Sequence, residues 1–140
     1  MIHVHNMKRY TSAWINSLFG GWLVATTFYF ISSSIQYGLP EKERIFNVLA
    51  FAVYVFAFSL IGNLIFVFPF RRQVENLIFI TSKIVFALIL SAYGLSIFVP
   101  VLSIMNADFS NLSDQLLTAS AALNGFTYGL IFYSYRKPIA

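Results

Sequence analysis

Residues 45–70 read IFNVLAFAVYVFAFSLIGNLIFVFPF and contain no charged side chain. A helix needs about 20 apolar residues, at about 1.5 Å per residue, to cross a hydrocarbon core about 30 Å thick. This stretch is long enough, and its apolar run is continuous, whereas a transmembrane β-strand would alternate over roughly 10 residues. The stretch therefore predicts a membrane-spanning α-helix.

Three further stretches of the 140-residue chain have the same character, and the polar segments between them are short. The composition agrees, because 59% of the residues are hydrophobic and 10% are charged, whereas charged residues make up about a quarter of soluble domains. We therefore predict an all-α integral membrane protein with a single four-helix domain over residues 1–140. The predicted spans are residues 12–35, 45–70, 77–105 and 115–135.

Basic residues are unevenly distributed over the polar segments. Pairs of them precede the first span, separate the second from the third and follow the fourth, at Lys8-Arg9, Arg71-Arg72 and Arg136-Lys137. On the opposite side the charges of residues 41–44 cancel, and Asp108 and Asp114 are uncompensated. The positive-inside rule therefore predicts that both termini and the second connection face the cytoplasm. Because the basic residues are scattered in pairs, the net charge of +4 does not indicate a nucleic-acid partner.

Three cations are candidate ligands for a phosphate group. Arg71 and Arg72 lie between two predicted spans, where an arginine pair can hold a lipid headgroup; setting the topology and contacting anionic lipid is the alternative role. Lys83 lies inside the third predicted span, about 9 Å below its cytoplasmic boundary. A lysine inside a span costs about 2.5–3.5 kcal/mol on insertion scales. Either its stem snorkels to the headgroups, or its ammonium binds an anionic ligand.

Uncharged polar residues lie at a similar depth in the other spans. Asn16, Asn63 and Tyr128 are each about 10 Å inside the predicted cytoplasmic face, and Asn124 lies closer to the midplane. Polar side chains within a membrane usually face protein or a water-filled cavity. These residues, with Lys83, therefore predict a polar pocket open to the cytoplasmic leaflet. Ordinary hydrogen bonds between helices are the alternative.

Small residues are also spaced for helix packing, because Gly125 and Gly129 form a small-xxx-small step. Such a step supports close approach of two helices, either within the chain or between two copies.

The sequence contains no pattern typical of catalysis or metal binding. Cysteine is absent, and the two histidines, His3 and His5, have no further ligand nearby. There is no Ser-His-Asp arrangement, no carboxylate pair and no glycine-rich phosphate loop. We therefore expect neither an enzyme nor a metal or cofactor site, and we favour a role in transport, binding or gating.

Several segments resemble GtrA-like proteins, a family of small four-span membrane proteins. The start of the chain is similar, since Lys8-Arg9-Tyr10 leads into a first helix that carries Asn16. The second and last spans add Phe46–Phe51, Phe58–Asn63, Phe66–Phe68 and Asn124–Phe132, with the basic pair Arg136-Lys137 at the end. The family usually places a basic residue directly after the asparagine that Asn63 matches. Leu64 follows here, and we expect Lys83 to supply the charge instead.

The resemblance implies translocation, or flipping, of a polyprenyl-phosphate-linked sugar such as undecaprenyl-phosphate glucose. The sugar would cross the bacterial inner membrane for O-antigen or other envelope polysaccharide, while the polyprenyl tail stays in lipid. The candidate substrate-binding residues are Asn16, Asn63, Arg71, Arg72, Lys83, Asn124 and Tyr128. Because four helices enclose little space, we expect a homodimer or larger assembly, and a membrane glycosyltransferase is a further candidate partner.

The competing hypothesis is a small membrane interaction protein, either an immunity protein against a pore-forming toxin or the anchor of a glycosyltransferase. Such a protein needs a specific helix surface rather than a polar pocket. An ion channel is less favoured, because the spans contain no carboxylate that could form a ring.

Overall fold

The computed structural model describes residues 2–38, 42–106 and 108–136, and nearly all of these are helical. The elements are α1 (Ile2–Tyr37), α2 (Lys42–Gly62), the π-helical turn η1 (Asn63–Val67), α3 (Arg71–Ile80), α4 (Lys83–Ile104) and α5 (Leu112–Arg136). Among the described residues, four helices are long and apolar enough to cross a membrane. The prediction of an all-α protein with four helices that could span a membrane is therefore confirmed.

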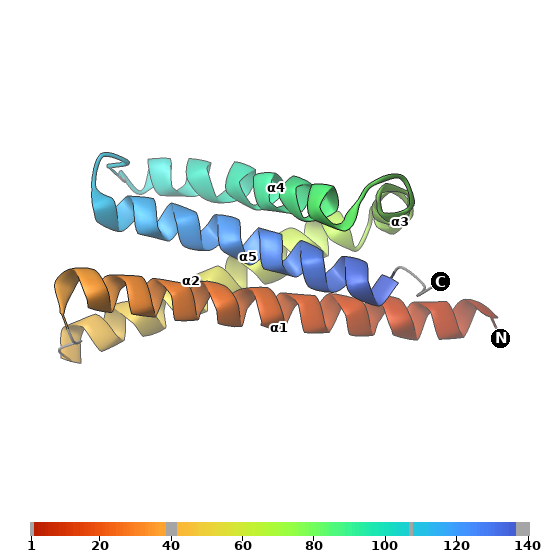
Figure 1. The fold of residues 1–140 in the computed structure, drawn as a ribbon, viewed down its shortest axis with the longest axis horizontal. Helices are drawn as coiled ribbons and strands as arrows, with labels where there is room; N and C mark the ends of the chain where they lie inside the picture. Colours follow the sequence, from red (N-terminus) through yellow and green to blue (C-terminus); the bar gives the residue numbers. More distant parts are fainter. Residues whose placement is uncertain (1, 39–41, 107, 137–140) are drawn as a thin grey trace.

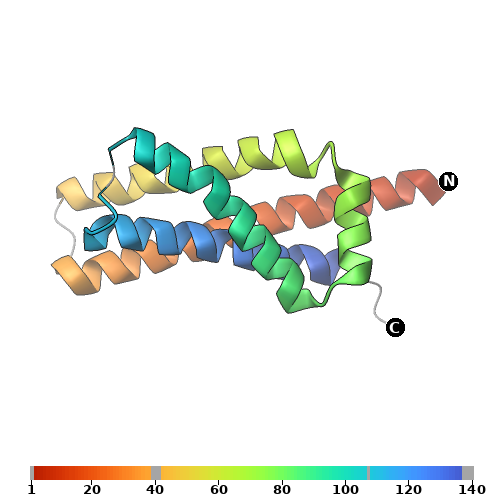
Figure 2. The same ribbon diagram turned by 90° about the horizontal axis from the view of Figure 1, so that it is seen from above.

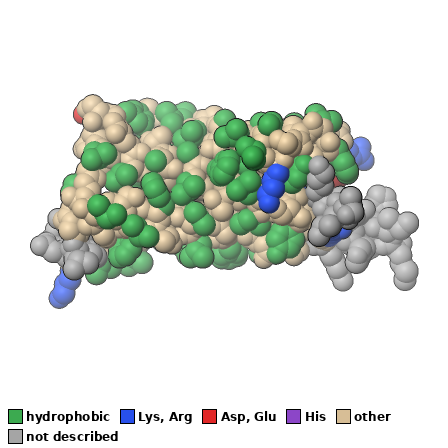
Figure 3. All heavy atoms as spheres, in the orientation of Figure 1, with side chains coloured by type: hydrophobic (Ala, Val, Ile, Leu, Met, Phe, Trp, Pro, Cys, Tyr) green, Lys and Arg blue, Asp and Glu red, His purple; other side chains and the backbone are tan. Residues whose placement is uncertain are grey.

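The surface of the bundle suits a lipid environment. Large hydrophobic side chains such as Leu23 on α1, Val53 on α2 and Ile84 on α4 are exposed. Figure 3 shows hydrophobic side chains along the whole length of one face and few charged ones. Soluble proteins rarely expose apolar surface on this scale, so these side chains face lipid.

Helix α5 lies at the centre of the bundle. It packs along α1 and along α4, while α2 packs mainly against α1 and contacts α4 much less; Figures 1 and 2 show this arrangement. A Cβ on Gly125 would lie 2.7 Å from the carbonyl oxygen of Leu90, and a Cβ on Gly129 would lie 2.6 Å from the Cα of Ala87. The two glycines therefore pack against α4 of the same chain.

Aromatic side chains from several helices meet in the core of the bundle. The ring of Phe132 stacks on Tyr128 with 5.7 Å between centroids, and its other neighbours are Tyr10 at 5.4 Å and Phe86 at 6.3 Å. Apolar burial does not drive helices together in lipid, so association depends on close packing and on hydrogen bonds. These ring contacts, each worth about 0.5–1.5 kcal/mol, supply much of that packing.

The third predicted span, residues 77–105, is divided in the structure. Helix α3 lies across one end of the bundle, roughly perpendicular to the long helices (Figures 1 and 2). Thr81 and Ser82 are extended, the Ser82 hydroxyl caps α4 by accepting the N–H of Val85 at 3.4 Å, and the Tyr133 hydroxyl donates to the Thr81 carbonyl at 3.0 Å. Lys83 is therefore the first residue of α4, with an exposed side chain. The prediction that placed it deep inside a span is wrong.

Helix α3 has the character of an interfacial helix. Its inner face packs Val74, Leu77 and Ile78 against the aromatic core, and Arg72 and Asn76 are exposed. A short amphipathic helix across the end of a bundle fits the headgroup layer. The described start of α1 and the end of α5 lie at the same end (Figure 1). We call it the α3 end.

Some residues of the charge pattern lie outside what the structure describes. They are Glu41 and Lys137, together with the side chains of His3, His5, Lys8, Glu43 and Arg44. Among the described residues, no cluster of His, Asp or Glu side chains could hold a metal ion.

Candidate functional site: a polar cavity within the membrane

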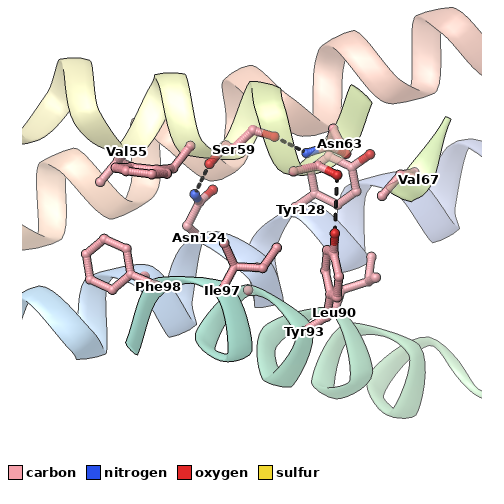
Figure 4. A pocket seen from close by; sticks show the side chains of 15 residues that line it. Val55, Ser59, Asn63, Val67, Leu90, Tyr93, Ile97, Phe98, Asn124 and Tyr128 are labelled. Atoms are coloured by element: carbon pink, nitrogen blue, oxygen red, sulfur yellow. Dashed lines mark hydrogen bonds between the residues drawn. The ribbon is translucent and has the colours of Figure 1, made fainter. Parts of the chain in front are cut away.

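A cavity of about 80 Å³ lies between α2, η1, α4 and α5 (Figure 4). None of the described residues that line it is charged. Most of its lining residues are apolar, and the polar ones are Ser59, Asn63, Tyr93, Asn124 and Tyr128. Tyr93 lies ten residues into α4, which corresponds to about 15 Å of helical rise. The cavity is therefore close to the middle of the hydrocarbon core.

The regular form of α2 ends where it reaches the cavity. Pro69 has no N–H to donate, and a proline ring clashes with the carbonyl four residues earlier. The π-turn η1 precedes it, and the N–H of Phe68 donates to the Asn63 carbonyl at 2.9 Å. The Tyr10 hydroxyl on α1 donates to the Val67 carbonyl at 3.0 Å, which pairs a carbonyl at the end of the turn. Such π-turns are frequent at functional sites, and this one begins at Asn63.

Polar bonds join three helices around the cavity, as Figure 4 shows. The Asn124 side-chain amide on α5 donates to the Ser59 hydroxyl on α2 at 2.6 Å. The Asn63 amide donates to the main-chain oxygen of Ser59, also at 2.6 Å. From α4, the Tyr93 hydroxyl donates to the Gly62 carbonyl at 3.2 Å. These bonds fix the side chains that line the cavity.

Two polar atoms on the cavity wall have no hydrogen-bond partner among the described residues. They are Asn63 Oδ1 and the Tyr128 hydroxyl, and these two residues are only 8% and 6% exposed. The Asn63 amide has one chemically sensible orientation, because the Ser59 main-chain oxygen only accepts and must face the NH₂ group. Leaving a buried polar atom unpaired costs roughly 1–3 kcal/mol. The two atoms therefore indicate a place for a hydrogen-bonding group that is not part of this chain.

The cavity brings together only some of the residues predicted from sequence, namely Asn63, Asn124 and Tyr128. Asn16 has an exposed side chain on α1, where its amide donates to the Ser12 hydroxyl at 3.4 Å, so it does not join the cavity. The predicted cations Arg71, Arg72 and Lys83 lie at the α3 end. The expected single pocket is therefore two separate features, an uncharged cavity and a charged end.

A charged cluster joins α1, α3 and α5 at the α3 end. Arg71 donates to Glu75 Oε1 at 3.3 Å, and Arg136 at the end of α5 donates to the same oxygen. Both guanidinium groups lie over the Tyr10 ring, 4.8 Å and 5.4 Å from its centroid. Cation–π contacts of this kind are worth about 0.5–2 kcal/mol. The cluster therefore holds α3 against the end of the bundle.

Sequence reasoning missed several residues of these two features. Glu75 follows Arg71 by four positions, the spacing of a helical ion pair, and this signal has meaning only once residues 71–80 are known to form a helix. Ser59 precedes Asn63 by four positions, which places both on one helix face. Nothing in the sequence distinguishes Tyr93 from the other tyrosines.

No protein-family model, no curated protein and no solved structure matches this chain. The resemblance to GtrA-like proteins accordingly rests on the sequence segments alone.

Proposed function

We propose that this protein moves a polyprenyl-phosphate-linked sugar across the bacterial inner membrane. The observation that carries the proposal is the uncharged cavity in the middle of the spans, which is lined mostly by apolar residues but has Asn63 and Tyr128 on its wall. A sugar that crosses a membrane loses its water, and buried amide and hydroxyl groups can replace that water. The resemblance to GtrA-like proteins supports the same class of substrate.

The α3 end suits the phosphate of such a lipid. Helix α3 lies at the level of the headgroups, and Arg72 and Lys83 are exposed there. By the positive-inside rule this end faces the cytoplasm, so the lipid would approach from the cytoplasmic leaflet. Lys83 would then act at the membrane boundary. The proposal therefore does not need a charged residue inside the span, which the sequence had led us to expect.

We expect the phosphosugar head of the lipid to pass between α2 and α4. The cavity of about 80 Å³ holds only a few groups of the size of water, so the helices must move apart for a whole head. Helix α2 contacts α4 much less than α5 does, and these two can separate while α4 and α5 stay together. No carboxylate of a described residue lines the cavity, so we expect consumption of the substrate to set the direction. In a homodimer this seam can lie at the subunit interface.

Native mass spectrometry of the protein, extracted gently from its membrane, tests the proposal. We expect a polyprenyl phosphosugar to co-purify. Asn63→Leu removes one hydrogen-bonding group from the cavity, and it should lower the bound fraction about threefold to tenfold, as expected for one hydrogen bond. Changing Arg71 and Arg72 to Gln together should also lower it. Asn16→Leu is the matched control, because Asn16 is exposed outside the cavity, and it should retain the lipid.

A different outcome would favour the membrane interaction protein. Finding only bulk phospholipid, with no response to Asn63→Leu or to the arginine changes, would contradict the transport proposal. Lys83→Met tests whether Lys83 or the arginine pair is the main ligand of the phosphate. Loss of the lipid in this variant would restore Lys83 as the main phosphate ligand, and retention would leave that role to the arginines.

A further inference from the structure

We infer that the cavity is a binding site for a neutral group that carries hydroxyls and that phosphate does not enter it. The inference rests on the proposed function for its substrate, and it specifies that the sugar, rather than the phosphate, occupies the middle of the membrane. The observations behind it are the two unpaired atoms on the wall, the fixed orientation of their side chains and the absence of charge among the lining residues.

The two unpaired atoms select for a hydroxyl by their hydrogen-bonding character. Asn63 Oδ1 can only accept a hydrogen bond, whereas the Tyr128 hydroxyl can donate one. A hydroxyl group both donates and accepts, so hydroxyl groups can pair with either atom. An ionised phosphate oxygen only accepts, and it would be repelled by Asn63 Oδ1. The wall therefore discriminates between the two halves of a phosphosugar.

The charge of the lining leads to the same selection. Within the part of the chain that the structure describes, no lining residue is charged, and a charge buried in a low-dielectric site without a partner is strongly disfavoured. The described basic residues Arg71, Arg72 and Arg136 lie at the α3 end instead. We therefore place the phosphate at the α3 end and the sugar in the cavity.

The binding atoms are held in place before any ligand arrives. The hydrogen bond from the Asn63 side-chain amide to the Ser59 main-chain oxygen, at 2.6 Å, keeps Asn63 Oδ1 from turning away. The Tyr128 ring is stacked on Phe132, with 5.7 Å between centroids. On the far side of α5, a Cβ on Gly21 would lie 2.5 Å from Asn124 Oδ1, so this glycine makes room for the Asn124 side chain.

Photolabelling with two alkyl probes of equal chain length tests the inference. One carries a glucose head and the other a phosphate head, and the protein is reconstituted in phosphatidylcholine nanodiscs. We expect the glucoside to label cavity residues on α2, α4 and α5, and the alkyl phosphate to label the α3 end. Tyr128→Phe should lower cavity labelling by the glucoside about threefold to tenfold, as expected for one hydrogen bond.

Two controls keep the result specific. Tyr54→Phe makes the same change on the exposed surface of α2 and should leave labelling unchanged. The Tyr128 hydroxyl has no partner to lose, so Tyr128→Phe should also keep the thermal stability of the parent protein. A structural role alone would lower stability and labelling together.

The inference would be overturned by alkyl phosphate labelling the cavity as strongly as the glucoside does, or by glucoside labelling that ignores Tyr128→Phe. Its failure is distinguishable from failure of the proposed function. Tyr128-dependent glucoside labelling without any co-purifying polyprenyl phosphosugar would support the site and contradict the transport proposal. A co-purifying polyprenyl phosphosugar whose phosphate cross-links to the cavity would do the reverse.

Discussion

Replacing both Gly125 and Gly129 with alanine should force α4 away from α5 and destabilise the bundle by up to about 4 kcal/mol net, since overpacking costs about 1–3 kcal/mol per site. The added Cβ atoms would lie 2.7 Å from the Leu90 carbonyl oxygen and 2.6 Å from the Ala87 Cα. Both are backbone atoms of α4, which cannot yield without moving the helix. Alanine gains about 1 kcal/mol per site in helix propensity, which is smaller than the clash. Unfolding by titration with a denaturing detergent measures the difference.

The matched control is Gly94→Ala, a glycine of α4 that faces α5. Its Cβ would lie 3.9 Å from the Ala121 carbonyl oxygen and 4.0 Å from the Gly125 Cα, which is ordinary contact. The substitution should therefore be neutral or stabilise the protein by up to about 1 kcal/mol. Equal stability of the Gly94 variant and the Gly125/Gly129 double variant would show that α4 and α5 do not approach as closely as described.

Depth in the membrane can be counted from sequence, but rotation about a helix axis cannot be fixed in the same way. Counting placed Asn63 and Tyr128 in one layer, and the structure brings them to one cavity. The same counting placed Asn16 there, yet its side chain is exposed while its neighbour Ser17 is fully buried. One residue turns a helix by about 100°, so a single step separates an inward from an outward position. The sequence alone therefore could not show whether Asn16 faces inward or outward.

The division between α3 and α4 was missed for a related reason. Residues 77–80 are apolar and lead directly toward the apolar residues of α4, so hydropathy merges them into one segment. Hydropathy measures how apolar a stretch is and not the direction of the helix axis. The cap at Ser82 marks the break, and a serine before a helix is a known start signal. Recognising it would have moved Lys83 to the membrane boundary.

Glu75→Gln should loosen α3 from the end of the bundle and lower the stability of its packing there by about 1–3 kcal/mol. Glu75 Oε1 accepts from both Arg71 and Arg136. Breaking a buried ion pair costs about 3–5 kcal/mol, and an exposed pair contributes about 0–1 kcal/mol. The side chains of Arg136, Glu75 and Arg71 are 12%, 26% and 30% exposed, so the effect lies between these limits. Hydrogen exchange of the α3 amides should become faster, which mass spectrometry can measure.

The same substitution should act in the opposite direction on anionic lipid. In the parent protein Glu75 neutralises part of the charge of two arginines over the Tyr10 ring. Removing the carboxylate leaves both guanidinium groups able to pair with a phosphate, so binding of an alkyl phosphate at the α3 end should increase while stability falls. Arg72→Gln is the control, because Arg72 is exposed on the same helix; it should weaken phosphate binding and leave the exchange of α3 unchanged. Equal exchange of α3 in both variants would mean that Val74, Leu77 and Ile78 hold the helix without the ion pairs. The charged cluster would then serve only to contact the lipid headgroups.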